Sequence, residues 1–283
     1  MHTTIASTES LAVHLAGDWV IVDCRFDLQN EQWGRDQYLT SHIPGAVYAS
    51  LSHDMAGPKT GSNGRHPLPS IEALSATLGR LGIAPGTQVV AYDQDSGMYA
   101  SRLWWLLRYV GHDAVAVLDG GWAKWTREGR PVRGGEETRS PATFVASPRP
   151  EMRISVDEVG AQLGNPKTLL VDARAPERYE GQIEPIDRVP GHIPGAVNRH
   201  YRSNGGDDFT LLPPQELRDQ FLKVLGSHEP SQAVLYCGSG VTACQNLLAM
   251  AHAGLPGARL YAGSWSEWSA DPARPVEKGS TRT

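Results

Sequence analysis

Short apolar runs alternate along the chain with longer segments whose apolar residues recur every three or four positions. In the second half, TLLVDAR (168–174) and QAVLY (232–236) have the character of buried strands. PPQELRDQFLKVLG (213–226) and TACQNLLAMAHAG (242–254) have helical spacing, and each ends at a glycine. This alternation predicts an α/β protein whose sheets are mainly parallel and flanked by helices.

The same order of segments occurs twice. VIVDCR (20–25) matches LLVDAR (169–174), and SHIPGAV (41–47) matches GHIPGAV (191–197). A third, longer block follows each pair and ends at RPV in both halves. Three collinear blocks indicate duplication of a unit that is about half the chain long.

The duplication predicts two domains, and they differ at one position. We expect an N-terminal domain over 1–135, a linker over 136–152 and a C-terminal domain over 153–283; the linker falls in a stretch rich in Gly, Pro and Ser (134–152). In the second half, Cys237 follows the apolar run AVLY (233–236). In the first half, Asp93 follows the corresponding run VVAY (89–92) and so occupies the matching position. A nucleophile in one copy alone predicts a catalytic C-terminal domain and a catalytically inactive N-terminal domain.

Composition is that of an ordinary globular protein. Hydrophobic residues make up 40%, charged residues 20%, and the net charge is -5, so the chain lacks the basic footprint of a nucleic-acid-binding protein. No segment has the run of about 18 apolar residues typical of a membrane helix, and the first residues do not resemble a signal peptide. Three cysteines are too few for a disulfide framework. We therefore expect a cytoplasmic protein with neither a membrane nor a nucleic-acid partner.

The loop that follows AVLY (233–236) has the features of a site for a catalytic nucleophile. Gly238, Ser239 and Gly240 allow the backbone to turn so that its N–H groups face inward at the start of a helix. Such a site stabilises a thiolate at Cys237. The alternative is a buried cysteine that serves as a small apolar residue. A cysteine phosphatase is disfavoured because the position of its phosphate-binding arginine holds Ala243.

These motifs resemble those of the tandem-domain rhodanese family of sulfurtransferases, over nearly the whole chain. The resemblance rests on CGSGVTA, on the two HIPGA blocks and on GSWSEW. It implies two rhodanese-like domains, each a mainly parallel sheet flanked by helices. The loop is most similar to that of 3-mercaptopyruvate sulfurtransferases, because thiosulfate-preferring members place cations where Gly238 and Ser239 stand here.

The resemblance also implies a reaction. Sulfane sulfur would move from 3-mercaptopyruvate to Cys237 as a persulfide with release of pyruvate, and then to cyanide or to a thiol such as thioredoxin or a low-molecular-weight thiol. This chemistry needs neither a metal nor an organic cofactor. The alternatives are a thiosulfate:cyanide sulfurtransferase and, from another class, a non-catalytic rhodanese-type binding module.

Several site residues follow from the family pattern. Arg178 matches a substrate-binding arginine, and Arg188 could match a second one; the alternative for Arg178 is a structural ion pair with Asp172 or Glu184, or a solvated side chain. The remaining loop residues expected to bind substrate or the transferred sulfur are Gly238, Gly240, Val241 and Thr242.

The family pattern further implies a proton relay. Ser239 matches its serine and His66, in GRHPLP, matches its histidine, although a plain loop histidine is an equally good interpretation. The aspartate of the relay is uncertain, because an ungapped alignment places Ser52 there and Asp54 lies two residues further on.

Overall fold

The computed structural model describes residues 1–280 and forms two compact units. The N-terminal unit consists of residues 1–57, 69–149 and 205–211. The C-terminal unit consists of residues 58–68, 150–204 and 212 onward. The segment 58–68, which precedes the expected linker by about 70 positions, therefore packs with the C-terminal unit.

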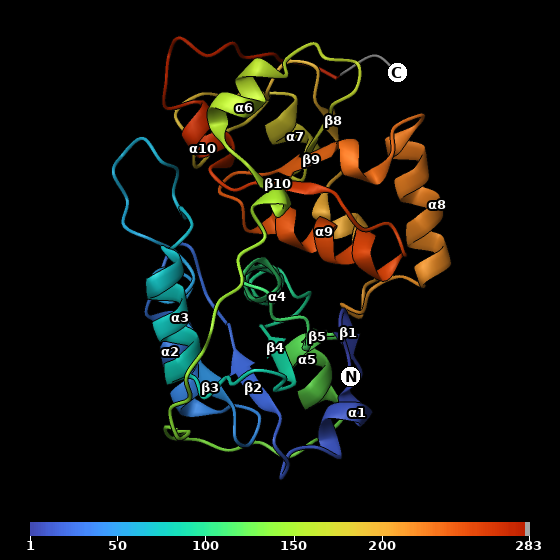
Figure 1. Cartoon of the computed structure of the whole chain (residues 1–283). Helices are drawn as coiled ribbons and strands as arrows, with labels where there is room; N and C mark the ends of the chain where they lie inside the picture. Colours follow the sequence, from blue (N-terminus) through green and yellow to red (C-terminus); the bar gives the residue numbers. More distant parts are fainter. Residues whose placement is uncertain (281–283) are drawn as a thin grey trace. The chain divides into compact units, whose positions relative to one another are not determined.

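The N-terminal unit contains one parallel sheet with the strand order β1-β5-β4-β2-β3 (Figure 1). Its elements are β1 (Ile5–Ala6), α1 (Thr8–Ala12), β2 (Val20–Asp23), α2 (Trp33–Thr40), β3 (Val47–Tyr48), α3 (Ile71–Arg80), β4 (Val89–Tyr92), α4 (Ala100–Tyr109), β5 (Val115–Leu118) and α5 (Gly121–Arg127). Every residue of β2, β4 and β5 is buried, because helices cover both faces of the sheet. Leu11 of α1 and Trp125 of α5 share a core with Ile21 and Val90.

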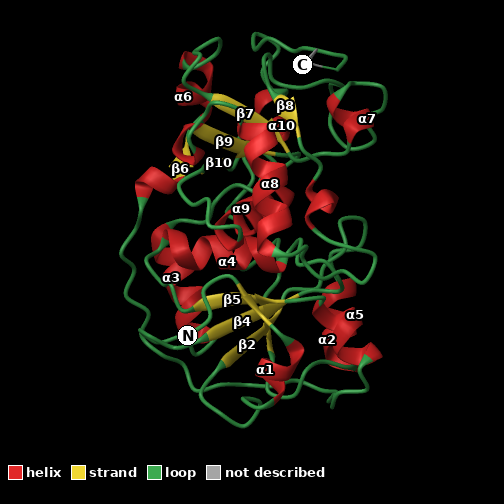
Figure 2. Ribbon diagram, turned by 90° about the vertical axis from the view of Figure 1, so that its right-hand side faces the viewer, coloured by secondary structure: helices red, strands yellow, loops and turns green. Residues whose placement is uncertain are grey.

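The C-terminal unit repeats this architecture with the strand order β6-β10-β9-β7-β8, again in parallel. Its elements are β6 (Arg153–Ile154), α6 (Val156–Ala161), β7 (Leu169–Asp172), α7 (Pro176–Tyr179), β8 (Val197–Asn198), α8 (Pro214–Leu225), β9 (Ala233–Tyr236), α9 (Thr242–His252), β10 (Arg259–Tyr261) and α10 (Ser264–Trp268), with three short 3-10 helices at Pro150–Met152, Tyr201–Asn204 and Pro230–Gln232. Helices and strands alternate along the unit, and Figure 2 shows its strands gathered together with helices around them. The prediction of an α/β protein with two mainly parallel, helix-flanked sheets is confirmed.

A buried ion pair explains why two sequence blocks recur together. At the end of β2, Arg25 binds the carboxylate of Asp23 at 2.6 Å and donates to the carbonyl of Ser41 at 2.6 Å. At the end of β7, Arg174 binds Asp172 at 2.6 Å and donates to the carbonyl of Gly191 at 2.7 Å. In each unit the arginine therefore ties the end of a central strand to the HIPGA turn.

In the N-terminal unit, the loop between β4 and α4 closes around a carboxylate. Asp93 is 1% exposed. Its oxygens accept hydrogen bonds from the backbone N–H groups of Asp95, Gly97, Tyr99 and Ala100, at 2.6–3.2 Å. The turn that surrounds a thiol in the second copy is thus filled by the protein's own anion in the first.

The carboxyl group of Asp93 should make stability depend on pH. Burial raises its pKa to about 6 from an ordinary value of 3.8, against the effect of the backbone hydrogen bonds. Between these pH values the folded state binds more protons than the unfolded state, so stability falls as pH rises. We expect the unfolding free energy of the wild type to fall by about 2 kcal/mol relative to Asp93→Asn between pH 4 and pH 7. Urea unfolding of both proteins at several pH values measures this, and parallel pH profiles would contradict it.

Candidate active site

Cys237 directly follows β9, at the carboxyl end of a central strand of the C-terminal sheet. Its side chain is 2% exposed, and its Sγ accepts a hydrogen bond from the backbone N–H of Gly240 at 3.1 Å. Gly240 has a φ of +74°. A Cβ atom there would lie 2.3 Å from the carbonyl oxygen of Ala262, so only glycine fits this turn. The sulfur is therefore held by the tight turn that the glycines predicted.

Two residues at the start of α10 make hydrogen bonds to the backbone of Cys237. Ser264 Oγ accepts the backbone N–H of Cys237 at 3.1 Å, and the N–H of Trp265 donates to the carbonyl of Cys237 at 2.9 Å. Ser264 has a φ of +56°, which is unusual for a residue with a side chain. In the repeat its counterpart is Gly121, with a φ of +53°. Ser264 was not among the site residues expected from the sequence. The glycine of the first copy is replaced by serine in the second, and this difference could have indicated its role.

Ser239 and His66 form a buried pair beside Cys237. The Oγ of Ser239 lies 2.9 Å from Nδ1 of His66, and the two residues are 7% and 3% exposed. His66 comes from the segment 58–68 of the C-terminal unit. The carboxylate of Asp54 is engaged elsewhere, because it accepts the N–H of Ser50 at 2.8 Å and pairs with Arg80. The structure thus brings together two of the relay residues that the family pattern implied.

Arg178, on α7, reaches the cysteine loop and is ion-paired as well. Its Nη2 lies 2.7 Å from Glu184 and 3.1 Å from Asp187. A Cβ atom on Gly238 would lie 3.6 Å from the same nitrogen. Burial alone would raise the pKa of Glu184, but the hydrogen bonds from Arg178 hold it below its ordinary value. The ion pair with Glu184 that was the structural alternative is therefore present, and the guanidinium also lies near Gly238; the binding of substrate by Arg178 stays a prediction.

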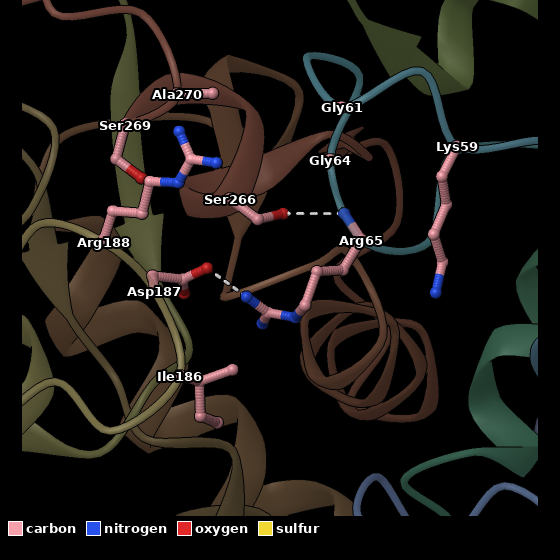
Figure 3. Close-up of a pocket in the computed structure, with 10 residues that line it drawn as sticks. All are labelled: Lys59, Gly61, Gly64, Arg65, Ile186, Asp187, Arg188, Ser266, Ser269 and Ala270. Carbon is pink, nitrogen blue, oxygen red and sulfur yellow. Dashed lines mark hydrogen bonds and ion pairs between the residues drawn. The ribbon is translucent and has the colours of Figure 1, made fainter.

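Arg188 lies in a cavity of about 240 Å³. Figure 3 shows Arg188 among the residues that line this cavity, together with Ser266 and Ser269. The N–H of Ser266 donates to the carbonyl of Gly238 at 2.9 Å, which links this cavity to the cysteine loop. Arg188 therefore lines a cavity that adjoins the loop through Ser266.

Two further charged residues were missed by the sequence analysis. Arg65 forms an ion pair with Asp187, whose side chain is only 4% exposed. Burial raises the pKa of Asp187, and the positive charges of Arg65 and Arg178 oppose that shift. Because Arg65 directly precedes His66, the sequence could have indicated that Arg65 lies at the site. It could not have indicated Asp187, which lies 122 positions further along the chain.

The remaining loop residues begin the helix that follows. Val241 is the N-terminal cap of α9 and Thr242 is its first residue. The thiol of Cys244 donates to the carbonyl of Gly240 at 3.2 Å, in keeping with a packing role. Within residues 1–280, no group of three or more His, Cys, Asp and Glu side chains is arranged to hold a metal ion. None of the helices in this part of the chain is both long and apolar enough to cross a membrane.

Comparison with known proteins identifies the two units. The model of the rhodanese-like domain matches residues 7–128 and again residues 155–271. The chain is 44% identical to a probable 3-mercaptopyruvate sulfurtransferase of Pseudomonas aeruginosa over 97% of this chain and 98% of that protein. It is 38% identical to a putative thiosulfate sulfurtransferase of Mycobacterium tuberculosis over 98% and 97% of the two chains.

Solved structures agree with the sequence matches. The structure of the 3-mercaptopyruvate sulfotransferase SseA of Escherichia coli superimposes with a TM-score of 0.81 at 29% identity, over 94% of this chain and all of that one. That of 3-mercaptopyruvate sulfurtransferase from Leishmania major gives a TM-score of 0.83 at 33% identity, over 94% and 74% of the chains. The protein therefore belongs to the rhodanese-like family and carries two copies of its domain.

Proposed function

We propose that the protein is a sulfurtransferase that takes sulfane sulfur from 3-mercaptopyruvate, holds it on Cys237 as a persulfide and passes it to a thiol or to cyanide. The proposal rests on the geometry at the carboxyl end of β9. The Sγ of Cys237 accepts the N–H of Gly240 at 3.1 Å, and the buried Ser239–His66 pair lies beside it. We assign catalysis to the C-terminal unit, and we propose that the N-terminal unit, with Asp93 in the matching turn, is inactive.

The first step forms the persulfide. The Cys237 thiolate attacks the sulfur of 3-mercaptopyruvate, a sulfur–sulfur bond forms, and the carbon–sulfur bond breaks with its electron pair on carbon. The leaving group is the enolate of pyruvate, which must gain a proton. Ser239 supplies it and is reprotonated through His66, because their side chains share a hydrogen bond of 2.9 Å. Arg178 and Arg188 bind the carboxylate of the donor.

The second step regenerates the thiolate. An acceptor thiolate attacks the outer sulfur of the persulfide, and the bond to Cys237 breaks with its electron pair on the cysteine. Thioredoxin or a low-molecular-weight thiol is the proposed acceptor. The N–H of Gly240 stabilises negative charge on sulfur in both steps. The transferred atom stays on the cysteine between the steps, so the scheme uses no organic cofactor.

The proposed function is tested by loading the purified protein with 3-mercaptopyruvate or with thiosulfate in parallel. We expect pyruvate release to match the gain of one sulfur atom on Cys237, measured by intact mass and peptide mapping. Absence of persulfide with either donor would overturn the proposal in favour of a non-catalytic binding module.

Ser239→Ala should separate the two donors. Pyruvate enolate needs a proton, whereas sulfite leaves from thiosulfate without one. We expect kcat/KM for 3-mercaptopyruvate to fall by about 10²-fold to 10³-fold and that for thiosulfate to change by less than about threefold. Steady-state rates with cyanide as the common acceptor measure this. An equal loss with both donors would show that Ser239 shapes the loop and does not supply the proton.

A further inference from the structure

A guanidinium group from outside the cysteine loop occupies the space beside Gly238. A Cβ atom built on Gly238 would lie 2.8 Å from Nη2 of Arg65, and the next nearest atoms belong to Arg178. A side chain at position 238 would therefore collide with Arg65. The loop itself has no charged residue between Cys237 and Thr242, yet two arginines adjoin it.

Arg65 is held in this place at both of its ends. Its backbone N–H donates to Ser266 Oγ at 3.0 Å, while its guanidinium pairs with the buried carboxylate of Asp187 (Figure 3). The N–H of Ser266 in turn donates to the carbonyl of Gly238 at 2.9 Å. The preceding residue, Gly64, has a φ of +84°, and a Cβ atom there would lie 2.8 Å from the carbonyl of Gly263. The segment is thus closely packed on the residues that brace the loop.

Basic residues outnumber acidic residues in the lining of the cavity to which Arg65 belongs. The cavity of about 240 Å³ is lined by the basic residues Lys59, Arg65 and Arg188 and, among the described residues, by one acidic residue, Asp187. Asp187 also binds Arg178 at 3.1 Å, and Arg178 has a second carboxylate partner in Glu184 at 2.7 Å. Arg65 lines the cavity and also lies against Gly238 of the loop, and its side chain is 27% exposed. An anion beside Gly238 would lie against the guanidinium group of Arg65, with that of Arg178 next nearest.

We propose that Arg65 is a specificity-determining residue that lets the site use thiosulfate, by binding the sulfonate end of that donor next to Gly238. This inference rests on the proposed function. The Cys237 thiolate forms a bond to the outer sulfur of thiosulfate, and the bond between the two sulfurs breaks with its electron pair on the departing sulfite. Negative charge grows on sulfite as it leaves, and Arg65 is placed to stabilise it. Thiosulfate carries two negative charges and 3-mercaptopyruvate one, so the cation favours thiosulfate more.

The test compares both donors in Arg65→Met, which keeps the length of the side chain and removes its charge. We expect kcat/KM for thiosulfate to fall by roughly 10-fold to 100-fold, as for loss of a charge-assisted hydrogen bond, and that for 3-mercaptopyruvate to fall by less than about threefold. Arg65→Lys should recover most of the thiosulfate rate. Arg153→Met removes one positive charge from an exposed position on β6 and should leave the ratio of the two donors unchanged.

Three outcomes would overturn the inference. They are an equal fall with both donors, an unchanged thiosulfate rate in Arg65→Met, and a wild type that uses 3-mercaptopyruvate and does not use thiosulfate. Thermal melting of each variant separates loss of charge from loss of folding, and if Arg65→Met melts early, Arg65→Lys and Arg65→Gln provide the comparison. Failure of the proposed function is distinguishable, because the wild type would then form no persulfide with either donor.

Discussion

Replacing Cys237 by serine is expected to abolish sulfur transfer from both donors. The hydroxyl group fits the same turn and can accept the N–H of Gly240, which contacts Sγ at 3.1 Å in the wild type. It is a much weaker nucleophile at neutral pH and cannot hold the transferred sulfur as a persulfide. We expect kcat/KM to fall by more than about 10⁴-fold, measured as pyruvate and sulfite release with cyanide as acceptor.

Cys244→Ser provides the matched control for this variant. Cys244 is buried on α9, and its thiol donates to the carbonyl of Gly240 at 3.2 Å, a bond that a serine hydroxyl can also make. We expect this control to retain its activity within about threefold and to gain the sulfur atom normally. Appreciable turnover in Cys237→Ser, or a persulfide mapped to Cys24 or Cys244, would contradict the assignment of the nucleophile.

Gly240→Ala is expected to have the second largest effect. A Cβ atom at this position would lie 2.3 Å from the carbonyl oxygen of Ala262, which belongs to the backbone and cannot move aside cheaply. The φ of +74° is also unfavourable for alanine. The loop must therefore shift, which moves the one N–H that contacts Sγ in the described structure. We expect kcat to fall by about 10²-fold to 10³-fold with both donors, as for loss of a donor that stabilises developing negative charge.

Gly164→Ala separates this loss from simple backbone strain. Gly164 has a φ of +73°, and a Cβ atom there would meet no atom within 4 Å. We expect this variant to lower the melting temperature and to keep kcat near that of the wild type. If Gly164→Ala lowered kcat as much as Gly240→Ala does, the effect would be due to general destabilisation. A wild-type kcat in Gly240→Ala would show that the N–H is not needed.

The fold was predictable because its signals are local. Continuous apolar runs such as AVLY mark strands buried on both faces, and helical spacing between them marks the covering helices. The sequence repeat also predicted that the second unit has the same fold as the first. In keeping with this, Arg25 and Arg174 make equivalent ion pairs in the two units. The segment 58–68 is the exception, because nothing in its composition indicates that it packs with the C-terminal unit.

The amino-acid sequence by itself determined the family and the glycine turn around Cys237, the proposed nucleophile, because these depend on residue types that lie within a few positions of one another. Only the tertiary structure decided which charges reach that turn. Arg65 and Asp187 are 122 positions apart, and Ser264 lies 27 positions after the backbone N–H that it accepts. Such contacts depend on how strand ends and loops meet in space. A loop without charged residues can therefore lie against two guanidinium groups, because neighbouring segments supply them.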